Sequence, residues 1–220
     1  LTFINYQVLF SNKNVLPSIF NSLFITLVGT VLNILLTILA AYALTRPQLV
    51  GKRVLMVFFI IMMLFDPGIV PEYMVVKALK LTGSQWSIIL CQAMNVYYLI
   101  VMMRYFEAVP PSLYEAARID GANHFSILFK IVCPLAKAGV ATLTMFYGVA
   151  RWNEYYRSGI YISSISKVPL QVILRKFVVD GDVTTLIGTQ NLFDYNALAK
   201  LDYTACLLYT SPSPRDRQKS

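Results

Sequence analysis

Charged residues are scarce in this chain. They make up 14% of its 220 residues, whereas soluble domains carry about a quarter. Residues 14–45 and 81–103 contain no charged residue, and two further stretches, 54–71 and 131–150, contain one each. Such a composition excludes an ordinary soluble domain.

Four apolar stretches are long enough to cross a membrane. An α-helix rises 1.5 Å per residue, so about 20 apolar residues cross a hydrocarbon core of roughly 30 Å. The sequence therefore predicts an all-α, multi-pass helical bundle in a lipid bilayer. The predicted spans cover residues 18–44, 54–71, 86–103 and 131–152. The alternative, buried helices of a large soluble core, seldom gives uninterrupted apolar runs of this length.

Residues that carry out chemistry are equally few. The three cysteines have no regular spacing, which argues against a disulfide framework or a metal site. His124 is the only histidine, and we expect it to be an exposed loop residue. No GxxxxGK[ST] loop and no Ser/His/Asp or paired-carboxylate constellation occurs. The sequence predicts a non-catalytic chain that binds no cofactor or metal.

Ionisable residues inside the predicted spans are limited to Asp66 and Lys137, both near span ends. Intramembrane carboxylates often mark ion pathways, so an ion-coupled secondary transporter is one alternative hypothesis. A second interpretation of Asp66-Pro67-Gly68 is structural, because Pro and Gly end helices and these residues close the second span.

The formal net charge is +8. A basic excess on a membrane protein usually lies in loops that face lipid headgroups, and nothing indicates nucleic acid. Residues 46–53 and the loop after the third span are both basic, so both are predicted to lie on the cytoplasmic side.

A polar loop between the third and fourth spans is the most informative feature. Residues 115–134 read EAARIDGANHFSILFKIVCP. Ser112 stands three residues before Glu115, the spacing of a capping box that begins a helix. Two adjacent alanines favour a flat helix face that another protein can approach closely. We expect this face to consist of Leu113, Ala116 and Ala117.

The rest of the loop predicts a turn and a second helix. Gly121 permits a positive φ and therefore a sharp turn, and Asn123 is suited to cap the helix that follows. Pro134 marks the bend into the fourth span. An apolar stripe is predicted at Phe125, Leu128, Phe129 and Val132. The result is a helix, turn and helix whose polar tip lies in water.

These residues resemble the EAA loop of ABC importer permeases. Glu115-Ala116-Ala117, Gly121, Ile131 and Pro134 have the family spacing, with Cys133 replacing the usual Leu. The flanks are similar to the maltose-type, carbohydrate-importing branch, and residues 63–77 to its complex-oligosaccharide subgroup. The flanking motifs are Asn21-Ser22-Leu23, residues 41–46, Arg104 with Pro110, and Trp152-Asn153.

The resemblance implies a larger assembly in the bacterial cytoplasmic membrane. Such a permease pairs with a second permease subunit, most often a different chain. Two cytoplasmic ATPases use ATP and Mg, and an extracytoplasmic solute-binding protein delivers the solute. The family has six spans, so we expect that this chain lacks the first and the last. An ABC permease for a non-sugar solute remains an alternative.

The resemblance also implies roles for the loop. The helix around Glu115 would be the coupling helix that sits in a cleft of one ATPase, with Glu115 paired to a basic residue. Gly121 would hold the bend. Ile131 and Pro134 would pass motion into the fourth span. The implied ATPase-coupling residues are Glu115, Ala116, Ala117, Asp120, Gly121, Ile131 and Pro134. Glu115 as a simple helix cap is the structural alternative.

Candidate substrate contacts lie near span ends. Sugar sites favour aromatic stacking together with amide and carboxylate hydrogen bonds. Residues of this kind are Asn95, Tyr97, Tyr98, Trp152, Asn153 and Glu154. Aromatic residues at span ends also form the ordinary interfacial belt, and this alternative stays open.

The two ends of the chain differ from its middle. Residues 1–14 resemble a polar connector from an upstream segment, while residues 206–220 resemble translated adapter sequence and are expected to be non-native. The permease domain is therefore predicted over residues 1–205. After Pro169, an amphipathic helix is predicted either on the membrane surface or across the bundle. Its stripe is Leu170, Ile173, Leu174 and Phe177.

Overall fold

A computed structural model describes residues 15–47, 49–65 and 67–178, and these residues form helices and connecting turns only. In chain order the elements are α2 (Val15–Thr45), α3 (Lys52–Leu64), α4 (Ile69–Ala78), α5 (Gln85–Cys91), α6 (Val96–Glu107), α7 (Pro111–Ile119), α8 (His124–Ile127), the π-helix η1 (Leu128–Val132), α9 (Cys133–Leu135), α10 (Lys137–Trp152), α11 (Tyr156–Tyr161), the 3₁₀-helix η2 (Ile165–Lys167) and α12 (Leu170–Val178). The predicted all-α class is confirmed for this part of the chain. The predicted connector 1–14 and the tail 206–220 lie outside it.

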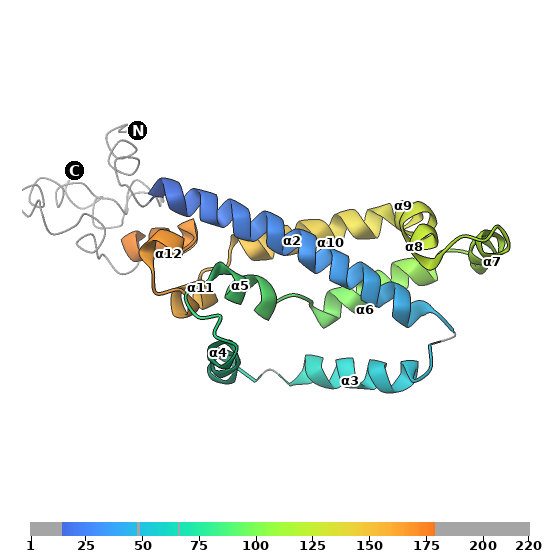
Figure 1. Cartoon of the computed structure of the whole chain (residues 1–220), viewed down its shortest axis with the longest axis horizontal. Helices are drawn as coiled ribbons and strands as arrows, with labels where there is room; N and C mark the ends of the chain where they lie inside the picture. The colour runs from blue at the N-terminus through green and yellow to red at the C-terminus, as the bar shows by residue number, and fades with distance from the viewer. Residues whose placement is uncertain (1–14, 48, 66, 179–220) are drawn as a thin grey trace, which may run out of the picture.

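The long helix α2 is the axis of the bundle. Its 31 residues correspond to about 46 Å at 1.5 Å per residue, enough to cross a bilayer with some tilt. In Figure 1, α10 and α6 run along it, α7 lies at one end, and α11 and α12 lie at the other. We call these the α7 end and the α12 end. In the described residues, α2 is the one unbroken helix long and apolar enough to span.

The other three predicted spans are bent pairs of shorter helices. The stretch 54–71 consists of α3 and α4, bent by 116° around Gly68, whose φ is 76°. The stretch 86–103 consists of α5 and α6, bent by 53°. The described residues contain up to four spans if each bent pair crosses once. Asp66 lies outside the described residues.

The fourth predicted span is also a bent pair. Residues 124–135 form one short arm and α10 the other, with an 87° bend between them. Ala136 lies at this corner and is buried, two positions after Pro134. Residues 131–135 thus belong to the arm that meets α10 at this corner. A proline cannot donate a backbone hydrogen bond, which favours such a break.

The helix after Pro169 packs across the bundle. The Oγ of Ser22 in α2 accepts a 2.7 Å hydrogen bond from the backbone N–H of Leu170, so α2 caps the first turn of α12. Asn21 donates to the carbonyl oxygens of Ser166 and Val168 at 2.8 and 3.2 Å. Asn21 and Ser22 therefore attach the start of α2 to residues 166–170.

Two apolar clusters hold the helices together. One joins the second half of α2 to α6, α7 and η1, with Ala41, Leu99 and Val132 fully buried. The other lies at the α12 end and joins Ile25 to Ile89 and Ile173. Along α3 no residue is buried, and its apolar side chains are exposed apart from the half-buried Met56 and Phe59. Such a surface is expected for a helix that faces lipid or a second subunit.

Candidate functional site

Helix α7 begins two residues earlier than the capping-box spacing predicts. Pro111 occupies its first turn, and Pro110 stands at the N-cap without a side-chain hydrogen bond. Ser112 therefore lies inside the helix, and the predicted box with Glu115 does not form. Pro is favoured at the first helical position because it has no N–H to leave unsatisfied. Glu115 is left exposed and is not used to cap the helix.

The two alanines of the loop lie in different surroundings. Ala117 is 6% exposed and packs with Tyr114 against the core cluster, whereas Ala116 faces solvent beside Glu115. The predicted flat face of Leu113, Ala116 and Ala117 is thus divided between core and surface, because residues adjacent in a helix point about 100° apart. What α7 presents outward is a broad surface that includes Leu113, Glu115, Ala116 and Ile119.

Gly121 ends α7 in the way the sequence predicts. Its φ is 73°, and its N–H donates to the carbonyl oxygen of Arg118 at 3.1 Å. The N–H of Ala122 donates to the carbonyl oxygen of Ala117 at 2.9 Å, which completes a Schellman motif with Asp120 at the C-cap. The turn directs the chain back toward α2.

The second helix of the loop differs from the predicted stripe. Leu128 and Val132 are buried together with Ile127, while Phe125 and Phe129 are 63% and 46% exposed. The reason is the π-helix η1, which shifts the helical register by one residue. Asn123 stands at the N-cap of α8, yet its side chain makes no capping bond. Among the coupling residues predicted here, Ile131 is half-buried and Pro134 exposed.

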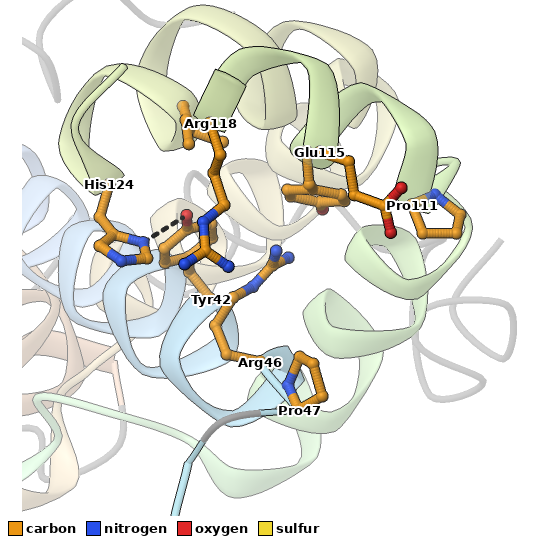
Figure 2. A pocket seen from close by; sticks show the side chains of 9 residues that line it. Tyr42, Arg46, Pro47, Pro111, Glu115, Arg118 and His124 are labelled. Carbon is orange, nitrogen blue, oxygen red and sulfur yellow. Dashed lines mark hydrogen bonds between the residues drawn. The ribbon is translucent and has the colours of Figure 1, made fainter. Parts of the chain in front are cut away.

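A cavity of about 140 Å³ lies between α7 and the end of α2. Figure 2 shows Arg46 and Arg118 turned into it from two different helices, while the carboxylate of Glu115 lies toward Pro111. The guanidinium carbon of Arg46 is 3.7 Å from the ring centre of Tyr114 and 4.5 Å from that of Tyr42. Such cation–π contacts are worth about 0.5–2 kcal/mol each, and they attach α7 to α2.

His124 is exposed, as predicted, but it also has a partner. Its Nδ1 lies 3.3 Å from the hydroxyl of Tyr42, at the floor of the same cavity. The basic loops predicted to share one side of the membrane do lie at one end of the bundle, since Arg46 and Arg118 line one cavity.

The predicted substrate contacts separate into two groups. Asn95 caps α6, accepting hydrogen bonds from the N–H groups of Tyr97 and Tyr98 at 2.9 and 3.3 Å. The ring of Tyr98 stacks on Phe146 and meets Tyr147 edge-on at 4.8 Å. These aromatic side chains lie at the break between α5 and α6, away from a span end.

The second group lies at the end of α10 and is mostly structural. The side-chain amide of Asn153 donates to the carbonyl oxygen of Val149, and Trp152 is partly exposed. Glu154 accepts from the backbone N–H of Arg157 at 2.9 Å. No interaction between the two groups appears among the described residues, so they do not form one site in this structure.

Arg151 is a buried arginine that was not predicted from the sequence. Arg151 is 3% exposed and donates to the carbonyl oxygens of Ile88, Ile89 and Gln92 at 2.6–3.0 Å. It also donates to Oδ1 of Asn33 in α2 at 3.0 Å. Arg151 therefore holds the C-terminal end of α5, where helix carbonyls have no partners within the helix. The sequence did hold one indication of a buried arginine, because Arg151 directly follows the apolar stretch 131–150.

An ion pair at the α12 end was also missed. Nε of Arg157 lies 2.9 and 3.0 Å from the two carboxylate oxygens of Glu72 and joins α11 to α4. Burial by itself would lower the pKa of Arg157, but the hydrogen bond and charge of Glu72 outweigh it and raise the pKa. Burial, with the charge of Glu72, raises the pKa of the neighbouring Tyr161 to about 12.

No group of three or more His, Cys, Asp or Glu side chains suited to a metal ion occurs in the described residues. The described cysteines, Cys91 and Cys133, are free.

Known proteins resemble this chain in sequence and in the arrangement of its helices. Residues 33–178 match the family described as binding-protein-dependent transport system inner membrane component. The polygalacturonan/rhamnogalacturonan transport system permease protein YtcP of Bacillus subtilis (strain 168) is 40% identical over 174 residues, covering 79% of this chain and 61% of that protein. Protein LplC of the same strain is 37% identical over 183 residues, covering 83% and 62%. The chain thus spans about three fifths of the length of these relatives.

A solved structure is also similar. It is a crystal structure of a bacterial ABC transporter involved in the import of the acidic polysaccharide alginate, with a TM-score of 0.84 and 33% sequence identity. The match covers 93% of this chain and 70% of that chain.

Proposed function

Because this chain belongs to the binding-protein-dependent transport system inner membrane components, we propose that its α7 couples a partner ATPase to the movement of the membrane helices. The chain is a non-catalytic ABC transporter subunit of the cytoplasmic membrane. ATP and Mg are therefore assigned to the ATPase partner. Two such ATPases, a second permease subunit and an extracytoplasmic solute-binding protein complete the proposed importer.

The observation that carries this proposal is the position and mounting of α7. The helix lies at one end of the bundle, beyond α2 and α6 (Figure 1). Tyr114 and Ala117 fix its inner side in the core, and the Tyr114 hydroxyl donates to the carbonyl oxygen of Phe106 at 3.3 Å. Glu115 and Ala116 remain exposed on its outer side. A helix that is rigid on one side and accessible on the other can transmit displacement from a docked partner.

The arm that follows supplies a route for the displacement. The turn at Gly121 connects α7 to α8, η1 and α9, and this arm meets α10 at an 87° corner. Leu128 and Val132 are fully buried in the core cluster, so the arm is held as a lever against α2 and α6. Asp120, Ile131 and Pro134 are its proposed joints.

The proposed solute is a carbohydrate. Two relatives support this class by name: the permease of a polygalacturonan/rhamnogalacturonan system and the sulfoquinovosyl glycerol transport system permease protein SmoH of Agrobacterium fabrum. The aromatic side chains Tyr97, Tyr98 and Phe146 lie together at the break between α5 and α6, and Asn95 lies beside them. Their partly exposed rings suit stacking on a sugar. Trp152, Asn153 and Glu154 are weaker candidates because the latter two already bond within the chain.

The experiment compares Glu115→Ala with Glu107→Ala in the complete reconstituted importer. Glu107 is a matched control because it lies near α7 and, among the described residues, pairs only with Arg104 at the surface. We expect Glu115→Ala to insert normally, yet to lose most of the ATP hydrolysis stimulated by the binding protein. Normal stimulation and transport in Glu115→Ala would contradict the coupling role.

A further inference from the structure

Two arginines at the α7 end have no acidic partner. Arg46 comes from the end of α2 and Arg118 from α7, and both line the cavity between these helices. Neither forms an ion pair with any residue that the structure describes. Glu115 lines the same cavity, but in Figure 2 its carboxylate lies toward Pro111 and away from both guanidinium groups.

The environment of Arg46 leaves one hydrogen-bond donor unsatisfied. Its guanidinium lies over the rings of Tyr42 and Tyr114, which supply no acceptor through their faces. Its Nε is buried and has no hydrogen-bond partner among the described residues. This Nε has no accessible surface, so an acceptor that enters the cavity would meet the terminal nitrogens of the guanidinium instead.

The cavity is open to one side and closed at its floor. Tyr42, Tyr114 and Ile127 are buried beneath it, whereas Pro47, Pro111 and Glu115 at its border are exposed. Its volume of about 140 Å³ lies below the roughly 300–1,000 Å³ of small-molecule sites. It suits one short side chain better than a free ligand.

We propose that this cavity receives a carboxylate side chain of the partner ATPase, held between Arg46 and Arg118. The proposal rests on the proposed function, in which α7 docks on that ATPase. A guanidinium group binds a carboxylate through two parallel N–H···O bonds, a geometry that a neutral side chain does not reproduce.

The charges around the cavity favour a protein partner. Glu115 at the border is negative, whereas the two groups inside are positive. A partner surface with one base and one acid at matching positions complements both, and like charges would oppose any other alignment. An anionic lipid headgroup would meet the negative charge of Glu115 at the entrance. The two contacts together would fix the register of α7 on the ATPase.

The position of Arg46 gives the contact a mechanical consequence. Arg46 follows directly after α2, whose side chains pack with α10 and α6. A carboxylate bound there would connect the ATPase to α2 as well as to the arm that leads to α10. ATPase closure would then act on two membrane helices through one docking site.

The test replaces arginine by lysine and captures the occupant. Lysine keeps the charge, and a water-soluble carbodiimide joins its amine to a nearby carboxylate as an amide, with the lost water taken up as the urea. We expect Arg118→Lys, in the importer assembled with its ATPase, to cross-link to an Asp or Glu of the ATPase, identified by mass spectrometry. Arg104→Lys is the control, because Arg104 is 79% exposed near the same end.

A binding measurement accompanies the cross-linking. The affinity of the detergent-solubilised permease for the purified ATPase is expected to fall at least about tenfold in Arg46→Gln and Arg118→Gln. It should stay within about twofold of the original in Arg104→Gln, whose partner Glu107 is exposed. Unchanged thermal unfolding of Arg118→Gln would establish that the loss is not a folding defect.

Three outcomes would overturn the inference. The lysine of Arg118→Lys cross-links only to Glu115 of its own chain; the glutamine variants bind the ATPase normally; or they lose affinity only for vesicles that contain an anionic lipid. In each of these cases the unsubstituted permease still binds its ATPase, so the proposed function survives. Failure of the unsubstituted permease to bind any ATPase would instead remove the proposed function itself.

Discussion

Arg151 passes α2 at Gly29. A Cβ atom placed on this glycine would lie 3.1 Å from Nε and 3.2 Å from Cδ of the arginine. The close approach lets the guanidinium reach across α2 to the carbonyl oxygens at the end of α5. Through Gly29 and Asn33 of α2 and the carbonyl oxygens of α5, Arg151 of α10 therefore joins three helices, and this contact positions the break that precedes Asn95.

The first prediction compares two glycines in the packed pair α2 and α10. Gly29→Ala is expected to crowd Arg151, whereas Gly148→Ala meets only Thr30 Oγ1 at 3.8 Å, an ordinary contact. Both changes gain the same helix propensity, up to about 1 kcal/mol, so their difference isolates the contact with Arg151. We expect Gly29→Ala to be less stable than Gly148→Ala by about 1–3 kcal/mol, since overpacking has costs of that size. Thermal unfolding in detergent measures this, and equal stability of the two variants would contradict it.

The second prediction uses the native cysteines as reporters of Arg151. In Arg151→Met, three carbonyl oxygens of residues 88–92 and the Asn33 amide oxygen lose their donor. We expect α5 to separate from α10 and the maleimide labelling of Cys91, its last residue, to become several-fold faster. Cys133 in α9 serves as the internal control, in a chain where Cys206 is replaced by Ser.

Arg151→Lys refines the same experiment. Lysine keeps the charge but presents one nitrogen in place of the guanidinium fork, so Cys91 labelling should be intermediate. Labelling of Cys91 that is the same in all three chains would show that Arg151 does not hold α5.

The third prediction exchanges residues between two equivalent helix ends. Lys80 ends α4 with φ 55°, and its neighbour Leu81 donates to Val76 as Ala122 donates to Ala117 after α7. A residue with a side chain costs roughly 1–2 kcal/mol in this left-handed conformation, and glycine avoids that cost. Gly121→Lys is expected to destabilise the protein by about 1 kcal/mol and Lys80→Gly to stabilise it by up to the same amount.

The double variant separates stability from coupling. Gly121→Lys combined with Lys80→Gly should unfold near the temperature of the original protein, while the strained turn still misaligns α7. We therefore expect ATP-driven transport to remain impaired although stability is restored. Recovery of transport in the double variant would assign Gly121 a role in stability alone.

The loop around α7 was largely predictable because its signals are local. The positive φ of Gly121 and the bend near Pro134 depend on the residues themselves, so the spacing of this segment was sufficient. The capping box failed because Pro111 and Ser112 compete for the start of the same helix, and proline is favoured at the first position. The stripe of the second helix failed because the π-turn of η1 changes the helical register, so Leu128 and Val132 are buried while Phe125 and Phe129 are exposed.

The sequence by itself determined the class of protein and the character of its loop. Shortage of charge and long apolar runs dictate membrane helices, and the EAA spacing gives the family resemblance, since both are carried by residues near one another in the chain. Tertiary structure alone decided where the spans break and which cations are buried. Gly29 and Asn33 meet Arg151, and Tyr42 meets Arg46 and Tyr114, only after helices distant in sequence have packed. A buried charge is stable only where the fold supplies its acceptors, and three of the four acceptors of Arg151 are backbone carbonyls, which residue types do not reveal.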